Sequence, residues 1–255
     1  MDLGLKDRVV IVTGGASGIG EAIVRALAAE GARPVIVDRD GEKAHAVAAA
    51  CAAHAIVVDL REDGACARVV EEGLRLHGRL DGVVNNAGVN DGVGLEQGSP
   101  ERFRDSLRTN LHHYYDLAHH ALPHLVASHG AIVNIASKVA VTGQGNTSGY
   151  AASKGAILGL TREWAAELAS RGVRVNAIIP AEVMTPQYRS WLDGLPDGTA
   201  REAAILARIP LGHRLTRPEE VAAMACFLFS AQAAHITGQF LHVDGGYAHL
   251  DRALP

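Results

Sequence analysis

Three side chains in the middle of the chain have the types and spacing needed to oxidise an alcohol. Tyr150 and Lys154 lie four residues apart in a stretch with helical apolar spacing, so their side chains share one helix face. A tyrosine can take a hydroxyl proton near neutral pH only if its pKa of about 10 is lowered. A lysine ammonium about 4 Å away, with the positive charge of an oxidised nicotinamide, provides stabilisation of the required order. Ser137, which follows a short apolar strand, would hold the substrate oxygen.

A glycine-rich turn predicts where such a cofactor would bind. Residues 13–20 read Thr-Gly-Gly-Ala-Ser-Gly-Ile-Gly, after the apolar run 9–12 and before a helix that begins near Glu21. Without side chains at these positions, backbone N–H groups and the positive end of the helix can approach a pyrophosphate. A plain tight turn would use the same glycines, but an acidic residue at the end of the next strand favours a dinucleotide.

That acidic residue is Asp38, which comes 18 residues after Gly20. Its carboxylate can accept hydrogen bonds from both ribose hydroxyls of the adenosine half, and it would repel a 2′-phosphate. Arg33 and Arg39 are near enough in the sequence to offset this repulsion, so NAD is favoured over NADP without excluding it. Asp59, at the end of the third strand, either contacts the adenine edge or is the N-cap of a helix.

The elements that must position these residues alternate along the chain. Helical apolar patterns separate seven β-branched or apolar runs, at 9–12, 35–37, 56–58, 83–84, 132–135, 173–178 and 240–243. Strands without a polar face are typical of a parallel sheet covered by helices on both sides. We therefore predict one doubly wound (Rossmann) α/β domain over residues 1–255, with seven parallel strands. The alternation fails once, and residues 181–213 or so are predicted to be an inserted substrate lid.

Composition excludes several classes of function. The 255 residues carry a formal net charge of −4, which gives no basic field for nucleic acid or an anionic membrane surface. No apolar run approaches membrane-spanning length, and residues 1–8 are too charged for a signal peptide. The three cysteines, Cys51, Cys66 and Cys226, are far apart in sequence, which favours a reducing compartment. The sequence thus predicts a cytoplasmic protein that binds a small molecule.

Several of these motifs, taken in order, resemble the short-chain dehydrogenase/reductase family from residue 5 to about 247. They are the turn 13–20, Asn85-Asn86-Ala87-Gly88, Asn110, Ser137, the run from Tyr150 to Lys154, and Val173-Arg174-Val175-Asn176. The resemblance implies nicotinamide-dependent carbonyl or alcohol chemistry, a catalytic tetrad of Asn110, Ser137, Tyr150 and Lys154, and a homotetramer built partly on the helices near Asn110 and Tyr150. Asn110 would position a water or the lysine.

The motif positions and the resemblance together predict the cofactor site. The expected residues are Gly14, Ser17, Gly18, Ile19, Gly20, Asp38, Asp59, Leu60, Asn86, Ala87, Gly88, Tyr150, Lys154, Pro180, Val183 and Thr185. The chain departs from the family pattern once. Pro180-Ala181-Glu182 replaces the usual Pro-Gly after the sixth strand, which places a carboxylate beside the expected substrate site.

The loops expected around the substrate are rich in polar side chains. The candidates are Asn90, Asp91, Ser137, Gln144, Asn146, Tyr150, Glu182, Tyr188 and Trp191. Amides and carboxylates, if buried, would stay unpaired unless the ligand carried several hydroxyls, so a sugar or polyol is favoured over a lipid. Trp191 could cover a pyranose face or pack on the lid's own core. The alternative for the whole set is ordinary solvated loop polarity.

Four strings narrow the expected substrate by resemblance. Residues 89–92, 143–150, 180–186 and 246–252 closely resemble the sugar dehydrogenases of this family that oxidise L-fucose at its anomeric carbon to the lactone. D-arabinose and L-galactose would be further substrates. Two rival functions are a reductase of 3-oxoacyl thioesters or small ketones and a non-catalytic nicotinamide-sensing protein. Asp38 and the polar loops argue against the first rival, and Tyr150 with Lys154 against the second.

Histidines cluster in one segment, at His112, His113, His119, His120 and His124. Offsets of seven and eight can share a helix face but give no recognisable ligand set, so no metal site is expected. We expect these histidines on the surface or in a subunit contact.

Overall fold

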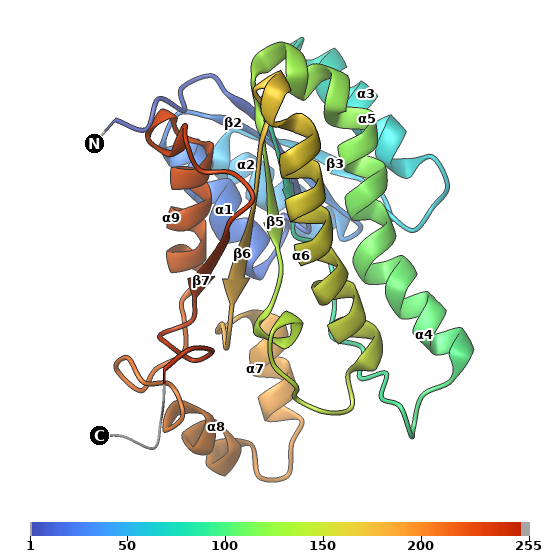
Figure 1. The fold of residues 1–255 in the computed structure, drawn as a ribbon, viewed down its shortest axis with the longest axis vertical. Helices are drawn as coiled ribbons and strands as arrows, with labels where there is room; N and C mark the ends of the chain where they lie inside the picture. The colour runs from blue at the N-terminus through green and yellow to red at the C-terminus, as the bar shows by residue number, and fades with distance from the viewer. Residues whose placement is uncertain (1, 251–255) are drawn as a thin grey trace.

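A computed structural model describes residues 2–250, and its centre is a seven-stranded parallel sheet (Figure 1). The strand order is β3-β2-β1-β4-β5-β6-β7 and every neighbouring pair is parallel. The strands are β1 Val9–Thr13, β2 Arg33–Asp38, β3 His54–Val57, β4 Gly82–Asn85, β5 Ala131–Ile135, β6 Arg174–Pro180 and β7 Phe240–Val243. Each of the seven predicted apolar runs contributes to one strand, which confirms the predicted fold class.

Helices cover both faces of the sheet, and each face has its own apolar core. On one face are α1 (Gly18–Ala29), α2 (Gly41–Cys51) and α9 (Pro218–Phe229). On the other are α3 (Ala65–His77), α5 (His113–Ser128) and α6 (Ser148–Leu168). Successive residues of β1 enter opposite cores, Val9 and Ile11 in one and Val10 and Val12 in the other. Both faces of the strand are therefore buried, as the apolar runs require.

The strand order reverses between β1 and β4, and this reversal opens a crevice at the carboxyl ends of the strands. The segments that follow each strand meet there. They include α4 (Pro100–Leu107), a π-helical turn η1 (Arg108–His112) and a short 3-10 turn η2 (Lys138–Ala140). A parallel sheet thus brings the ends of β1, β2, β4, β5 and β6 to one edge of the molecule.

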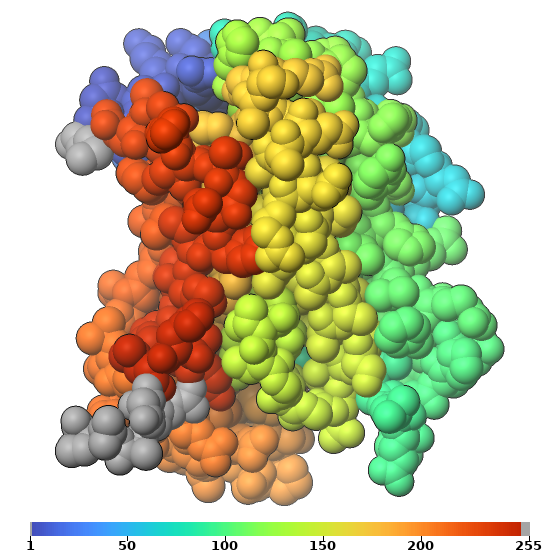
Figure 2. Space-filling model, viewed as in Figure 1, coloured from blue at the N-terminus to red at the C-terminus, as the bar shows by residue number. Residues whose placement is uncertain are grey.

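The segment predicted as an inserted lid contains two helices, α7 (Pro186–Asp193) and α8 (Gly198–Leu206). They lie beyond the carboxyl end of β6 (Figure 1). In Figure 2 the chain after β7, in red, packs beside this orange region and the yellow-green loop that precedes α6. Of the string 246–252 that carries part of the sequence resemblance, Asp251 and Arg252 lie outside the described residues.

The glycine turn between β1 and α1 is shaped by two different demands. Gly18 has a φ of +57°, which side-chain-bearing residues rarely adopt. Gly20 has room for no side chain, because a Cβ there would overlap the carbonyl oxygen of Gly14. The turn can fold as it does only because both positions are glycine.

Substituting Gly20 with Ala should therefore destabilise the fold by about 1–3 kcal/mol, since the turn must shift to accommodate the methyl group. Urea unfolding measures this change, and calorimetric titration with NAD should show weaker binding. Gly73 in α3 is the matched control, because a Cβ there would lie 3.6 Å from the Ile11 side chain, an ordinary contact. Gly73→Ala should leave stability equal or higher. Equal stabilities for Gly20→Ala and the wild type would contradict the close approach.

Candidate active site

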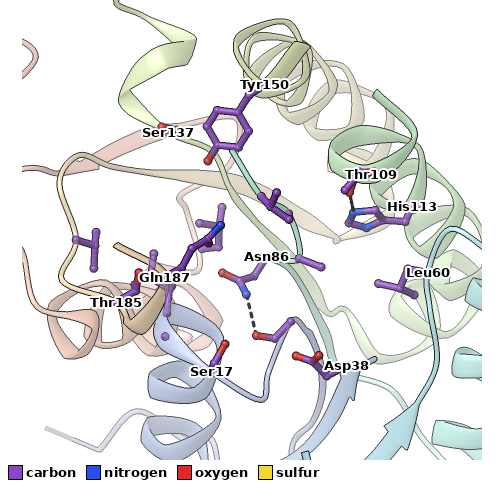
Figure 3. Close-up of a pocket in the computed structure, with 18 of the residues that line it drawn as sticks. Ser17, Asp38, Leu60, Asn86, Thr109, His113, Ser137, Tyr150, Thr185 and Gln187 are labelled. Carbon is purple, nitrogen blue, oxygen red and sulfur yellow. Dashed lines mark hydrogen bonds between the residues drawn. The ribbon is translucent and has the colours of Figure 1, made fainter. Parts of the chain in front are cut away.

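Two cavities meet at the carboxyl edge of the sheet, and the predicted catalytic side chains form part of the wall between them. The first has a volume of about 380 Å³ and runs past the glycine turn and the end of β2. The second has a volume of about 960 Å³ and extends under the lid helices. Ser137 and Tyr150 line both cavities. Figure 3 shows them at one end of the first cavity, with Ser17 and Asp38 at the other.

The first cavity gathers nearly all of the residues predicted to bind a cofactor. It is lined by Gly14, Ser17, Gly18, Ile19, Asp38, Asp59, Leu60, Asn86, Ala87, Gly88, Tyr150, Lys154, Pro180, Val183 and Thr185. Gly20 is the exception, since its role is the close approach to Gly14. Asn86 also supports the turn directly, because its Nδ2 donates to the carbonyl oxygens of Thr13 (2.9 Å) and Gly14 (3.2 Å).

The carboxylate of Asp38 is fixed at the end of β2 by two backbone groups. It accepts hydrogen bonds from the N–H of Ala16 (3.1 Å) and of Asp40 (3.0 Å). These bonds fix the carboxylate on the wall of the first cavity, next to the glycine turn. Arg39 and Arg61 line the same cavity, so charges of both signs surround the expected adenosine position.

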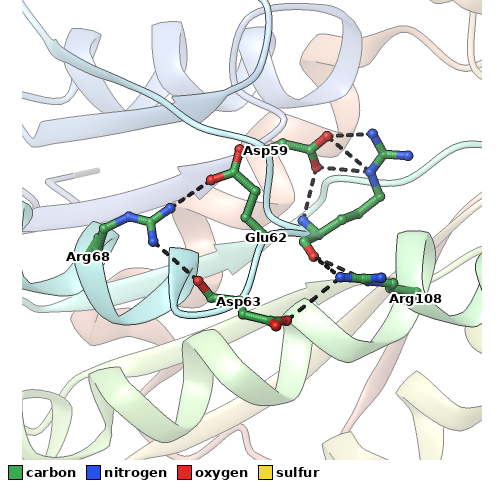
Figure 4. Close-up of polar contacts among 6 residues, drawn as sticks. Asp59, Glu62, Asp63, Arg68 and Arg108 are labelled. Carbon is green, nitrogen blue, oxygen red and sulfur yellow. Dashed lines mark hydrogen bonds and ion pairs between the residues drawn. The ribbon is translucent and has the colours of Figure 1, made fainter.

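Asp59 lies in a network of carboxylates and guanidinium groups (Figure 4). Arg61 donates to both Asp59 oxygens, and this hydrogen bonding lowers the pKa of Asp59 to about 2. Arg108 in turn donates to the carbonyl oxygen of Arg61 at 2.7 Å. The predicted alternative that Asp59 is a helix N-cap is wrong, because α3 begins at Ala65 with Gly64 as its N-cap. Contact with adenine stays a prediction.

Asn110 is fully buried in the π-helical turn and acts on the backbone. Its Oδ1 accepts a hydrogen bond from the N–H of Val89 (2.7 Å), and its Nδ2 donates to the carbonyl of Ser106 (3.0 Å). Asn110 thereby fixes the strand end that carries Gly88, which lines both cavities. Asn110 itself lines neither cavity.

The predicted catalytic lysine has a buried partner, Tyr114, which the sequence analysis missed. Lys154 Nζ donates to the carbonyl of Ile135 (2.8 Å) and to the hydroxyl of Tyr114 (3.1 Å). The Tyr114 hydroxyl donates to the same carbonyl at 3.0 Å. Tyr114 lies one helical turn after Asn110, and that spacing was the signal that could have found it.

Burial controls the protonation of the catalytic pair. It raises the pKa of Tyr150 to about 12, against the lowering effect of hydrogen bonding with Ser137. It also lowers the pKa of Lys154 to about 7, so the ammonium loses much of its charge near neutral pH. Lys154 Nζ lies 5.5 Å from the centre of the Tyr150 ring. The expected acidification of Tyr150 by Lys154 and an oxidised nicotinamide together stays a prediction, since in the chain alone desolvation dominates and raises the Tyr150 pKa.

The second cavity gathers every residue predicted to contact a substrate. It is lined by Asn90, Asp91, Ser137, Gln144, Asn146, Tyr150, Glu182, Tyr188 and Trp191. Two polar atoms among them, Oδ1 of Asp91 and the hydroxyl of Tyr188, are buried without a hydrogen-bond partner among residues 2–250. Sequence reasoning missed Lys138, Arg201, Arg208 and Tyr247, which also line this cavity. Lys138 directly follows Ser137, and that position could have drawn attention to it.

The histidine cluster divides between the surface and the interior. His112, His119 and His120 are exposed, as expected for surface positions, and His119 stacks on Tyr115 with 6.0 Å between ring centres. His113 contradicts that expectation, since it is buried beside the first cavity and burial lowers its pKa to about 4. Within residues 2–250, no three histidine, cysteine or acidic side chains are placed to hold a metal ion together.

A family model described as enoyl-(acyl carrier protein) reductase matches residues 14–248. The chain belongs to the short-chain dehydrogenase/reductase family. L-fucose dehydrogenase from Bos taurus is 41% identical over 243 residues, which cover 94% of this chain and 88% of that relative. A 3-oxoacyl-[acyl-carrier-protein] reductase, FabG, from Thermotoga maritima is 35% identical over 248 residues, covering 95% and 98%.

Solved structures of short-chain dehydrogenases superpose over nearly the whole chain. The crystal structure of Cj0485 dehydrogenase has a TM-score of 0.95 at 44% identity and covers 100% of this chain and 99% of its own. The ligand-free aldohexose dehydrogenase of Thermoplasma acidophilum has a TM-score of 0.90 at 30% identity, with coverage of 99% and 98%. A 3-ketoacyl-(acyl-carrier-protein) reductase from Brucella melitensis, complexed with NADH, has a TM-score of 0.86 at 33% identity, with coverage of 96% and 99%.

Family membership and geometry agree on the chemistry of this short-chain dehydrogenase. It is an NAD(P)-dependent oxidoreductase that acts on CH–OH groups. The residues present fit a dinucleotide, because Gly14 and Gly18 of the glycine turn line the first cavity together with the carboxylate of Asp38. No helix within residues 2–250 is long and apolar enough to cross a membrane.

The lowered pKa of Lys154 predicts how stability depends on pH in this short-chain dehydrogenase. The unfolded chain carries this lysine at its ordinary pKa of 10.5, whereas the folded chain carries it at about 7. Between these values the unfolded state binds more protons, so the stability of the wild type relative to Lys154→Met should rise with pH. The cost of burying the charge is fully present below pH 7.

Urea unfolding at several pH values between about 7 and 10 should show this relative gain, on the order of a few kcal/mol. The same series on Lys6→Met, an exposed lysine, controls for the loss of one charge. The quantity to follow is the free energy of unfolding of the wild type minus that of Lys154→Met. If this difference stays constant or falls as the pH rises, the buried environment of Lys154 is contradicted.

Proposed function

We propose that the chain oxidises an aldose at its anomeric carbon with NAD as acceptor, and that L-fucose, giving the lactone, is its main substrate. One observation carries the proposal: unpartnered buried polar atoms of Asp91 and Tyr188 line the cavity that adjoins Tyr150 and Ser137. Ring hydroxyls would satisfy such atoms, whereas an acyl chain would leave them unpaired. The similarity to L-fucose and aldohexose dehydrogenases supports the same substrate class. D-arabinose and L-galactose follow as further substrates.

The catalytic side chains divide the reaction between them. Ser137 holds the oxygen of the C1 hydroxyl, and Tyr150 takes its proton. A nicotinamide held by the first cavity would supply the hydride acceptor for C1 and a positive charge near the phenol. Lys154, fixed by Tyr114 and Ile135, lines that cavity, where it would contact the cofactor and could pass the proton on. A lactol hydroxyl is thereby converted to the carbonyl of an ester.

Replacing Tyr150 with Phe should lower kcat for L-fucose by about 10²- to 10⁴-fold, because it removes the hydroxyl that is proposed to take the proton. NAD binding, measured by calorimetry, should stay nearly unchanged. Tyr115→Phe is the matched control, since Tyr115 is exposed on α5 and lines neither cavity. Turnover by Tyr150→Phe close to that of Tyr115→Phe would refute the assigned base.

The preference for NAD rests on the fixed carboxylate of Asp38. In Asp38→Ala, kcat/KM for NADP divided by kcat/KM for NAD should rise by on the order of tenfold to a hundredfold. The reason is that a negative charge no longer faces the 2′-phosphate. Adding Arg39→Ala to that variant should reverse part of the gain, since Arg39 lines the same cavity and would contact the phosphate. An unchanged ratio in Asp38→Ala would exclude Asp38 as the determinant.

A reductase of 3-oxoacyl thioesters is the second candidate, favoured by the identity to FabG and by the NADH-bound reductase structure. Absorbance of reduced nicotinamide separates the two, with aldoses and NAD in one assay and 3-oxoacyl thioesters with NADH or NADPH in the other. Turnover on thioesters alone would overturn the sugar assignment. The non-catalytic rival is wrong, because family membership and the identity to L-fucose dehydrogenase show the chain to be an enzyme.

We further propose that residues 181–213 close over the substrate, since Gln187, Tyr188 and Trp191 of α7 line the second cavity. Arg189 of α7 pairs with Glu202 of α8 at 3.0 Å, which links the two helices of this segment. The homotetramer stays a prediction. The resemblance places a subunit contact on α5 and α6, and Tyr115 of α5 is exposed there beside Trp164 of α6. A cytoplasmic location stays a prediction as well.

A further inference from the structure

A buried ion pair lies on the wall of the substrate cavity. Lys138 Nζ contacts the carboxylate of Glu182, and the two side chains are only 9% and 13% exposed. Lys138 opens the turn that follows Ser137, and Glu182 stands two residues after the end of β6. The pair therefore joins the loops after two neighbouring parallel strands, next to the catalytic serine.

A third residue completes this group. The ring of Tyr247, from the segment after β7, faces the Lys138 ammonium with 4.3 Å between the nitrogen and the ring centre. That segment is held in a tight hook, because Asp244 accepts hydrogen bonds from the N–H of Gly246 (2.8 Å) and of Ala248 (2.9 Å). Lys138, Glu182 and Tyr247 all line the second cavity. We call these three residues the ion-pair cluster.

The location of the ion-pair cluster points to a ligand. Burying an ion pair costs desolvation energy that its mutual attraction rarely recovers, and apolar residues would join two loops as well or better. A carboxylate accepts hydrogen bonds, an ammonium donates them, and a sugar hydroxyl does both. Adjacent hydroxyls of a ring can therefore bind to such a pair.

We propose that the ion-pair cluster binds two adjacent ring hydroxyls of the sugar and so determines which substrates are accepted. Glu182 accepts from one hydroxyl, Lys138 holds the carboxylate in place and donates to the neighbouring one, and the Tyr247 ring orients the ammonium. This inference rests on the proposed sugar oxidation. It adds Lys138 and Tyr247 to the residues that select the substrate, and it gives a role to the carboxylate that Glu182 places beside the substrate site.

The test compares Lys138→Met and Glu182→Gln with the wild type on L-fucose and on its analogues that each lack one ring hydroxyl. For at least one analogue the wild-type kcat/KM with NAD should fall by about tenfold to a hundredfold, since a hydrogen bond to a charged group is lost. For each variant, kcat/KM on L-fucose itself should fall by a similar factor. Its kcat/KM values for L-fucose and for that analogue should then be equal. The double variant should be no worse than the poorer single variant, because the two side chains act as a unit.

Controls separate recognition from folding. Lys6→Met and Glu21→Gln make the same changes outside the two cavities. Lys6 is exposed, and Glu21 pairs with Arg25 on the surface of α1. Both variants should discriminate between L-fucose and its analogues as the wild type does. The dissociation constant for NAD should stay within about twofold in every variant, while Lys138→Arg should recover part of the discrimination. If Lys138→Met does not fold, Glu182→Gln, which keeps the shape of the side chain, decides alone.

The outcomes are distinct. A uniform loss on L-fucose and all analogues, or retained discrimination in both variants, would show that the ion pair only joins two loops and would overturn the inference, with sugar oxidation intact. A wild type that turns over no aldose would overturn the proposed function and the inference with it.

Discussion

Burial of Lys154 is the constraint on which the active centre depends. Its nitrogen donates to the Ile135 carbonyl and the Tyr114 hydroxyl, and both residues are buried. The same enclosure raises the pKa of Tyr150 and lowers that of Lys154. Desolvation thus raises the pKa of the Tyr150 phenol in the chain alone, so its predicted role as a base calls for added positive charge beside it.

Much of this arrangement could be predicted from the sequence, because it follows from local patterns. Apolar runs without a polar face indicated buried parallel strands, and the glycine turn with Asp38 indicated the first cavity. In a parallel sheet, the residues after each strand necessarily meet at one edge. Nearly every position predicted for a cofactor or a substrate therefore lines one of the two cavities, although those positions are spread over more than half of the chain.

The rest could not be predicted, since it depends on contacts between segments distant in sequence. The sign of the Tyr150 pKa shift depends on how completely α6 packs over β5. Asp59 is bound by Arg61 rather than capping a helix, because α3 begins four residues later than Arg61. His113 faces inward because α5 turns that side toward the first cavity. Lys138 and Glu182 are 44 residues apart, and no spacing rule predicts their contact.

The hook formed by Asp244 has a practical consequence for work with this molecule. The hook holds the segment after β7 so that Tyr247 lines the second cavity. The N-terminal end of the chain, which leads into β1, lies at the opposite edge of the sheet (Figure 1). An affinity tag or fusion partner joined near the hook would lie beside that cavity and restrict access to it. One joined ahead of β1 would be remote from both cavities, so recombinant versions intended for assays should carry their additions there.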